Sequence, residues 1–300
     1  ANKVLLVYGG GSIKKNGIYD VIRQNLEQNE IEFVELSGVE PNPRIASVRK
    51  GVALCREHDV QAVLAVGGGS TIDCAKMIAS GVYYTGDPWE QVLDAHKIEK
   101  ALPIAVVLTL AATGSEMDGY AVISDLDKNE KWSSGNDLTK PTFAILDPEY
   151  TYSVPMKQTI SGITDIMSHT FESYFTREKG AYLQSRFCES ILKTCVTFAE
   201  VLVKNPQDYE ARANIMWASS MAINGICSYG QQVAWSVHAI EHELSAFYDI
   251  THGIGLAILT PYWMEYVLNE DTKWRFVEYG KNVWELHGAT DMEIAKKAIE

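Results

Sequence analysis

The chain has 300 residues, a net charge of −13 and a hydrophobic fraction of 46%. This length predicts about two domains of about 150 residues each, with enough apolar residues for substantial cores. The acidic balance argues against nucleic acid or an anionic membrane surface as the main partner. Five cysteines without a CxxC pair are typical of reduced thiols, so we expect a cytoplasmic protein without a disulfide framework.

Residues 1–153 alternate short apolar runs with amphipathic stretches. Strands are predicted at 3–10, 31–38, 62–68, 103–110 and 142–147, and helices at 16–28, 44–58, 70–82 and 88–94. This alternation predicts a parallel sheet that is covered on both faces. We expect no signal peptide, because the chain opens directly on a strand, and no membrane span, because the longest apolar stretch (101–114) is too short.

The strand pattern stops near residue 156, where the composition also changes. Helices are predicted at 156–177, 180–204, 207–228, 231–247, 252–268 and 271–287. We therefore expect an α/β nucleotide-binding domain at 1–153 and an all-helical domain at 154–300.

Two segments of the first domain run from an apolar strand into three glycines and then a serine. They are VYGGGSIKKNG at 7–17 and AVGGGSTIDCAK at 65–76. Glycines let the backbone approach a phosphate closely, and a helix N-terminus offers free amides to an anion. Neither segment is the GxGxxG fingerprint, and a plain strand-to-helix turn explains one such loop equally well. Two loops of this kind in one α/β domain favour a nucleotide.

A third polar cluster, TLAATGSE at 109–116, follows the strongest central strand. Thr109, Thr113 and Ser115 are expected at the carboxyl edge of the sheet, where ligands bind in open α/β folds. For Ser70 and Asp73 there is a second interpretation, since a serine with an acid three residues later fits a helix N-cap.

Candidate metal ligands gather in the second half of the chain. Asp165 and His169 are four residues apart and share one face of a predicted helix. His238 lies one turn before His242, and His252 follows ten residues later. A lone histidine on an apolar helix is usually a core residue, but a buried carboxylate and imidazole need partners. A carboxylate with imidazoles and no thiolate favours a catalytic Fe²⁺ or Zn²⁺.

Two other interpretations belong to different classes of protein. The segment HAIEH at 238–242 matches the H-x-x-E-H pattern of zinc metalloproteases, with Glu241 as the general base. That interpretation leaves Asp165, His169 and both glycine loops unexplained. The other alternative is a non-catalytic nucleotide-binding protein with buried polar networks.

The segments GGGSTIDCAK and TLAATGSE, the Asp165–His169 pair and the His238–His252 spacing resemble the iron-containing (group III) alcohol dehydrogenases, within them the bacterial butanol dehydrogenases. The resemblance covers essentially the whole chain. It implies a dehydroquinate synthase-like architecture: an α/β nucleotide domain, an all-helical metal domain, and an active site between them. It also implies that an N-terminal strand and C-terminal helices lie beyond both ends of this sequence.

The resemblance also implies functional residues. The metal ligands would be Asp165, His169, His238 and His252, with His242 as a catalytic proton-relay group that does not bind the metal. The cofactor contacts would be Gly9, Gly10, Gly11, Ser12, Gly68, Gly69, Ser70, Asp73, Thr109, Thr113, Ser115 and Lys131.

The expected enzyme is an NAD(P)H-dependent alcohol dehydrogenase with one divalent metal, Fe²⁺ or Zn²⁺. It would interconvert short-chain aldehydes such as butanal and primary alcohols, as a cytoplasmic homodimer. NADP(H) is the expected preference over NAD(H), because Gly9 stands where an aspartate would repel a 2′-phosphate. Ser12, Lys14 and Lys15 are close to Gly9 in the sequence and would favour that phosphate.

Overall fold

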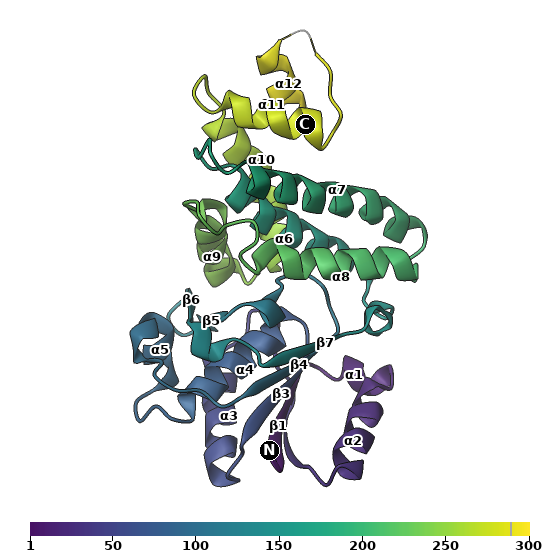
Figure 1. Cartoon of the computed structure of the whole chain (residues 1–300). Helices are drawn as coiled ribbons and strands as arrows, with labels where there is room; N and C mark the ends of the chain where they lie inside the picture. The colour runs from purple at the N-terminus through teal and green to yellow at the C-terminus, as the bar shows by residue number, and fades with distance from the viewer. Residues whose placement is uncertain (289) are drawn as a thin grey trace.

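A computed structural model describes residues 1–288 and 290–300. An N-terminal α/β half lies below a C-terminal helical half in Figure 1, and the C-terminus is at the far end of the helices. Within the described ranges, no helix combines the length and the apolar character needed to cross a membrane.

The α/β half is built on a parallel sheet with strand order β2-β1-β3-β4-β7. Its strands are β1 (Lys3–Tyr8), β2 (Glu32–Leu36), β3 (Ala62–Gly67), β4 (Ile104–Leu108) and β7 (Phe143–Leu146). All four pairings are parallel, so the predicted sheet is confirmed. The order reverses between β1 and β3, which is the kind of switch point where doubly wound folds bind ligands.

Helices cover both faces of this sheet (Figure 1). They are α1 (Ser12–Lys15), α2 (Ile18–Gln28), α3 (Ile45–Glu57), α4 (Gly69–Gly81) and α5 (Pro88–Leu93), with 3₁₀ turns at Ala95–Lys97, Ser115–Met117, Asp137–Thr139 and Pro148–Thr151. Val4 and Leu6 pack with α1 and α2, whereas Leu5 and Val7 pack with α3 and α4. Because alternate residues of β1 are buried on opposite faces, the strand after Lys3 is an unbroken buried run of apolar and aromatic residues.

An antiparallel hairpin of β5 (Tyr120–Asp125) and β6 (Glu130–Gly135) was not predicted from the sequence. Its strands carry exposed Tyr120 and Trp132 among polar residues, so the apolar pattern is weak. The turn contains Asn129 in the left-handed region with φ of 52°, a conformation that asparagine tolerates well.

The second half is helical, as predicted. Its helices are α6 (Met156–Tyr174), α7 (Tyr182–Lys204), α8 (Tyr209–Ile223), α9 (Ser236–Tyr248), α10 (His252–Val267), α11 (Lys273–Asn282) and α12 (Asp291–Lys297). Three predicted boundaries are wrong, one of them in the helix predicted over 271–287, which ends at Asn282. The helix predicted to reach 228 ends at Ile223, shortly before Gly225 with φ of 100°, and the helix predicted from 231 begins only after Trp235, whose φ is 51°. The domain boundary after Ser153 stays a prediction.

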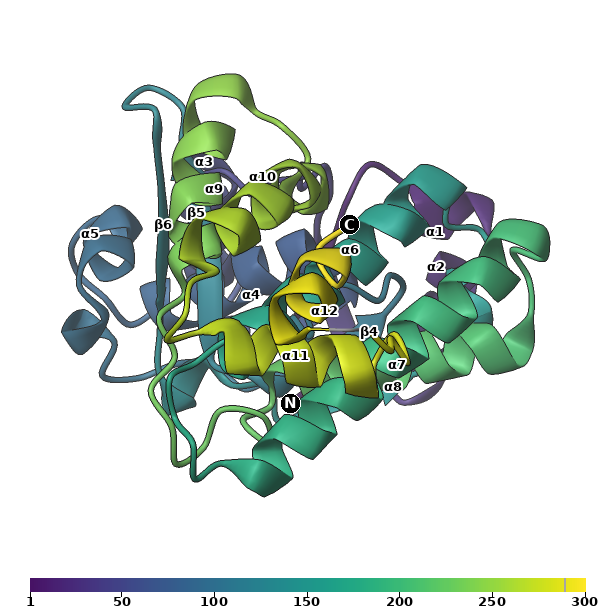
Figure 2. The same ribbon diagram turned by 90° about the horizontal axis from the view of Figure 1, so that it is seen from above.

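The two halves meet closely where the loop after β4 contacts α6 and α8. A Cβ at Gly162 of α6 would lie 2.4 Å from the Ala111 carbonyl oxygen. Ser219 of α8 donates a hydrogen bond of 3.2 Å to the Ala112 carbonyl. On the other side of the junction, α9 lies beside β6 (Figure 2). The loop at the carboxyl end of β4 is therefore fixed against the helices of the second half.

The contact at Gly162 gives a stability prediction. Gly162→Ala should lower the melting temperature, because the added methyl group meets a backbone carbonyl and overpacking costs about 1–3 kcal/mol. Gly180→Ala is the matched control, since no atom lies within 4 Å of its added Cβ. Calorimetry of both variants decides the matter, and an unchanged melting temperature for Gly162→Ala would show that the junction is loose.

Candidate metal and nucleotide site

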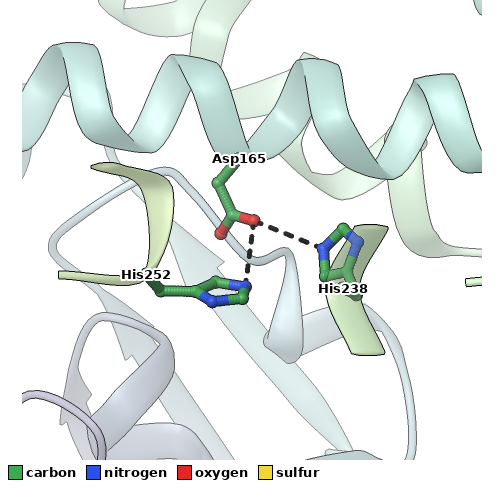
Figure 3. Close-up of side chains that lie close together, drawn as sticks. All are labelled: Asp165, His238 and His252. Carbon is green, nitrogen blue, oxygen red and sulfur yellow. Dashed lines mark ion pairs between the residues drawn. The ribbon is translucent and has the colours of Figure 1, made fainter. Parts of the chain in front are cut away.

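One carboxylate in the second half is surrounded by three imidazoles. Asp165 Oδ1 lies 3.6 Å from His169 Nε2, 3.8 Å from His238 Nε2 and 3.6 Å from His252 Nε2. Figure 3 shows Asp165 pointing from α6 toward His238 on α9 and His252 on α10. The structure thus brings together the four residues that the sequence singled out as metal ligands.

The cluster fits a divalent metal on two grounds. Asp165 Oδ1 and His238 Nε2 are buried, and neither has a hydrogen-bond partner among the described residues. Buried polar atoms without partners are costly, so their convergence indicates a missing cation. Ligands at about 2.0–2.2 Å in a tetrahedral arrangement stand about 3.4 Å apart, close to the three distances from Asp165 Oδ1.

Close helix packing places these side chains. Asp165 and His169 are one turn apart on the buried face of α6. His252 is the first residue of α10, and a Cβ at the next residue, Gly253, would lie 2.1 Å from the Ser161 carbonyl of α6. Only glycine allows the two backbones to approach this closely, so Gly253 lets His252 reach Asp165.

Glu172, three residues after His169, orients His238. Its buried carboxylate accepts hydrogen bonds from the backbone amides of Ser236, Val237 and His238 at 2.8–3.0 Å. It also lies 3.3 Å from His238 Nδ1. Glu172 therefore caps α9 from another helix and leaves His238 Nε2 directed at Asp165. Sequence reasoning missed this residue, although its i,i+3 spacing from His169 was a signal.

Glu241, three residues after His238, is in contact with His252. Its fully buried carboxylate accepts hydrogen bonds from His252 Nδ1 and from Ser245 Oγ. Lys131 of β6 lies 3.3 Å from Glu241 and 3.2 Å from Asn42 Oδ1. The resemblance implied that Lys131 contacts the cofactor. The structure places its Nζ on Glu241, so Lys131 links the β5–β6 hairpin to the residue that contacts His252.

The fourth histidine of the region stands apart from Asp165. The centroid of the His242 ring lies 5.7 Å from that of the His252 ring. Burial lowers the pKa of His242 to about 3, and the charge of Lys131 acts in the same direction. His242 is therefore neutral near pH 7 and lies beside the cluster.

Charges around Asp165 favour its ionised form. Burial by itself would raise the pKa of Asp165, but His169, His252 and His238 together hold it below its ordinary value. Burial lowers the pKa of His169 to about 4, against the opposing effect of Asp165. Burial also opposes protonation of His238, yet the nearby carboxylates of Asp165 and Glu172 raise its pKa to about 9. A charged carboxylate is the form that binds a cation.

The glycine loops lie at the carboxyl ends of β1 and β3, on both sides of the switch point. Gly11 has a left-handed φ of 96°, and Gly9, Gly10 and Ser12 complete this turn into α1. Among the described residues, no atom lies within 4 Å of an added Cβ at Gly10 or Gly11, so the loop borders open space. Such a loop exposes backbone amides to an anion.

The second glycine loop is packed more tightly against the polar cluster after β4. A Cβ at Gly69 would lie 2.3 Å from Thr113 Oγ1, and one at Gly68 would lie 3.1 Å from Leu110. The Thr109 amide donates a hydrogen bond of 3.0 Å to the Gly67 carbonyl. The structure therefore brings Gly68, Gly69, Thr109 and Thr113 to one edge.

The N-cap interpretation of Ser70 and Asp73 is wrong. Helix α4 begins at Gly69 without a side-chain cap. Asp73 instead accepts hydrogen bonds from Ser115 Oγ at 2.6 Å and from the Val122 amide at 2.9 Å. Lys76 also donates to Ser115, at 2.8 Å. These bonds tie α4 to the loop after β4 and to the hairpin.

The first glycine loop has charged neighbours that the sequence did not reveal. Lys14 Nζ lies 3.4 Å from Glu35 at the end of β2 and stacks over the rings of Tyr8 and Tyr19. Both tyrosines donate hydrogen bonds to the same carboxylate. Glu35 thereby offsets much of the positive charge that Lys14 would offer to a 2′-phosphate.

The metalloprotease interpretation finds no support. In an H-x-x-E-H site the glutamate must be free to activate water, but Glu241 is fully buried and bonded to His252, Lys131 and Ser245.

All five cysteines are free and buried, in agreement with the prediction that there is no disulfide framework.

Comparison with known proteins agrees with this arrangement. Residues 1–148 match the family described as iron-containing alcohol dehydrogenase, and residues 159–300 match the C-terminal part of the same family. NADH-dependent butanol dehydrogenase A of Clostridium acetobutylicum is 59% identical over 100% of this chain and 77% of its own length. NADPH-dependent aldehyde reductase YqhD of Escherichia coli is 39% identical over 99% of this chain and 77% of its own length.

A crystal structure of NADH-dependent butanol dehydrogenase A from Thermotoga maritima superposes with a TM-score of 0.96. It is 42% identical, and the match covers 99% of this chain and 74% of that one. The fold and the sequence therefore agree on one class, the two-part dehydrogenases with an α/β half and a helical half. This chain belongs to the iron-containing alcohol dehydrogenase family.

Proposed function

We propose that this protein is a metal-dependent alcohol dehydrogenase that transfers hydride between a nicotinamide cofactor and short-chain aldehydes or primary alcohols. The observation that carries the proposal is the buried Asp165 Oδ1, unpartnered among the described residues and surrounded by three imidazole Nε2 atoms at 3.6–3.8 Å. The butanol dehydrogenase and aldehyde reductase names of its relatives support the substrate class. The family match gives no support to a non-catalytic nucleotide-binding protein.

Asp165, His169, His238 and His252 would hold the metal. When bound, the metal supplies Lewis acidity toward the carbonyl oxygen, and the reduced nicotinamide supplies the hydride. Asp165, His169 and His238 are buried and His252 is partly buried, so the four side chains are held in place and little reorganisation is needed at the reacting oxygen. His242, beside His252, would relay a proton to the alkoxide oxygen as it forms, giving the N–H proton of its neutral ring while the other ring nitrogen takes one from solvent.

The phosphates of the cofactor would meet the two glycine loops. Gly9, Gly10, Gly11 and Ser12 contribute one set of backbone amides at the end of β1, and Gly68, Gly69 and Ser70 contribute the other at the start of α4. Thr109 and Thr113 offer hydroxyl groups from the neighbouring loop. Asp73 and Ser115 support that loop through their mutual hydrogen bond.

Iron is the metal that the family description names. Zinc remains the alternative, because it outcompetes iron for most nitrogen and oxygen sites. The cytoplasmic homodimer that the sequence analysis expected stays a prediction.

The first prediction for this function concerns His252. The protein, stripped of metal and reconstituted with Fe²⁺ or Zn²⁺, should oxidise NADH in the presence of butanal. His252→Ala should lose both metal and this activity, yet still quench the fluorescence of NADH, because the glycine loops are intact. His96→Ala, which alters an exposed histidine, is the control. Full activity with metal retained in His252→Ala would refute the assignment.

The role of His242 is tested separately. His242→Ala should keep most of the metal but lower turnover by about 10²–10⁴-fold and change its pH profile, since a proton relay is lost. His287→Ala provides an exposed histidine for comparison. If His242→Ala loses its metal altogether, His242 is a ligand and the proposed ligand set is incorrect.

For the cofactor we propose a preference for NADH, against the sequence expectation of NADP(H). The relative with 59% identity is named NADH-dependent, whereas the relative with 39% identity is named NADPH-dependent. Glu35 supports the same choice, because it offsets the charge of Lys14 beside the first glycine loop. A 2′-phosphate would therefore find less positive charge there than the sequence suggested.

Gly9→Asp should strengthen the preference for NADH. Gly9 has no positive φ, and an added Cβ would come 3.3 Å from the Val39 carbonyl, so a side chain needs only a small adjustment. A carboxylate there would repel the 2′-phosphate, by about 1–3 kcal/mol or roughly 5- to 150-fold in kcat/KM. Gly9→Asn, which is isosteric and neutral, is the control. A wild type that prefers NADPH, or equal ratios in both variants, would contradict this proposal.

A further inference from the structure

The carboxylate of Glu241 connects the two consecutive helices α9 and α10 to strand β6, which is far away in the sequence. It accepts a hydrogen bond from His252 Nδ1 at the start of α10 and another from Ser245 on α9. Its third partner, Lys131 Nζ, comes from β6 of the other half at 3.3 Å. Lys131 and Glu241 are both buried, with side-chain exposures of 4% and 0%. An ion pair removed from water in this way is held only by well-placed partners.

Glu241 has little freedom to move. A Cβ at Gly255 of α10 would lie 2.8 Å from both Cγ and Oε1 of Glu241. The Glu241 side chain therefore packs directly against the backbone of α10, one turn after His252. Any larger side chain at Gly255 would displace Glu241 without removing its charge.

The α/β half also contacts the short segment between α9 and α10 that leads into His252. Asn42 accepts a hydrogen bond from Lys131 and donates hydrogen bonds to Asp249 at 3.1 Å and to the Ile250 carbonyl at 3.2 Å. Arg44 donates from Nη2 to both carboxylate oxygens of Asp249, each at 2.8 Å. His252 is thus fixed from two directions, through its ring by Glu241 and through its backbone by the segment before it.

We propose that Lys131 and Glu241 are positioning residues for the metal site, and that Lys131 carries this function from the nucleotide-binding half to His252. The inference rests on the proposed role of His252 as a ligand. Nδ1 of His252 donates its proton to Glu241, which leaves the Nε2 lone pair directed at Asp165. The partner of the second ring nitrogen decides which nitrogen is free for a metal.

This role differs from the cofactor contact that the family resemblance implied for Lys131. A residue that only binds the cofactor changes nucleotide affinity and leaves the metal untouched. A residue that holds Glu241 changes metal affinity even when no nucleotide is present. The structure places Lys131 Nζ on Glu241 and Asn42, so the second effect is expected.

The test measures metal affinity without nucleotide. Lys131→Met and Glu241→Gln should each bind Co²⁺ and Zn²⁺ about 10–100-fold more weakly in chelator competition, since the partners of metal-binding histidines typically contribute this much. The visible absorption of bound Co²⁺ should change in both variants, because the His252 ring is no longer held. Lys131→Arg should restore most of the affinity. Lys128→Met, at the turn of the same hairpin and half-exposed, is the control.

Gly255→Ala keeps every charge but displaces Glu241, so it should weaken metal binding as well. Far-ultraviolet circular dichroism and melting temperatures of all variants show whether each is folded. If Lys131→Met does not fold, Glu241→Gln and Gly255→Ala decide the inference.

Wild-type metal affinity and an unchanged Co²⁺ spectrum in Lys131→Met, with only NADH binding weakened, would overturn the inference. Wild-type metal affinity and an unchanged Co²⁺ spectrum in Glu241→Gln and Gly255→Ala would overturn the inference for Glu241. Failure of the wild type itself to bind a metal would instead overturn the proposed function, so the two failures are distinguishable.

Discussion

Burial of the Asp165 carboxylate is the constraint on which the helical half depends. Among the described residues no donor bonds to Oδ1, which is costly for a buried charge, and three imidazole Nε2 atoms lie 3.6–3.8 Å from it. Two further carboxylates fix that arrangement: Glu172 of α6 holds His238 of α9, and Glu241 of α9 holds His252 of α10. Each glutamate follows one histidine of the cluster by three residues and contacts the next, so these contacts link α6 to α9 and α9 to α10.

The α/β half supplies the other part of the site through its topology. Its strand order puts the switch point between β1 and β3, where both glycine loops emerge. Gly162 of α6, three residues before Asp165, lies against the Ala111 carbonyl of the neighbouring loop. A ligand held at the glycine loops is thereby brought to the same edge as the metal cluster, which is the requirement for direct hydride transfer between cofactor and substrate.

Much of this could be predicted because the relevant signals are local. Strands buried on both faces read as continuous apolar runs, and the i,i+4 spacing of Asp165 and His169 places them on one helix face. The pairing of these two with His238 and His252 came from resemblance to a family, since no local pattern links residues so far apart. The β5–β6 hairpin was missed because exposed aromatic and polar residues obscure the alternation of apolar and polar side chains in its strands. The position of Lys131, which lies in β6, was missed for the same reason.

The start of α9 shows why local rules fail at this site. Helices usually begin at a serine, threonine, aspartate or asparagine, whereas here the capping position is Trp235 in a left-handed conformation. The free amides at this end are bonded by Glu172, 64 to 66 residues earlier in the chain. A sequence window around 231–247 contains no trace of that partner, so the helix was predicted to begin too early. The carboxylate that bonds the start of the helix also contacts His238, so the boundary of α9 and the position of the His238 ring depend on the same residue, Glu172.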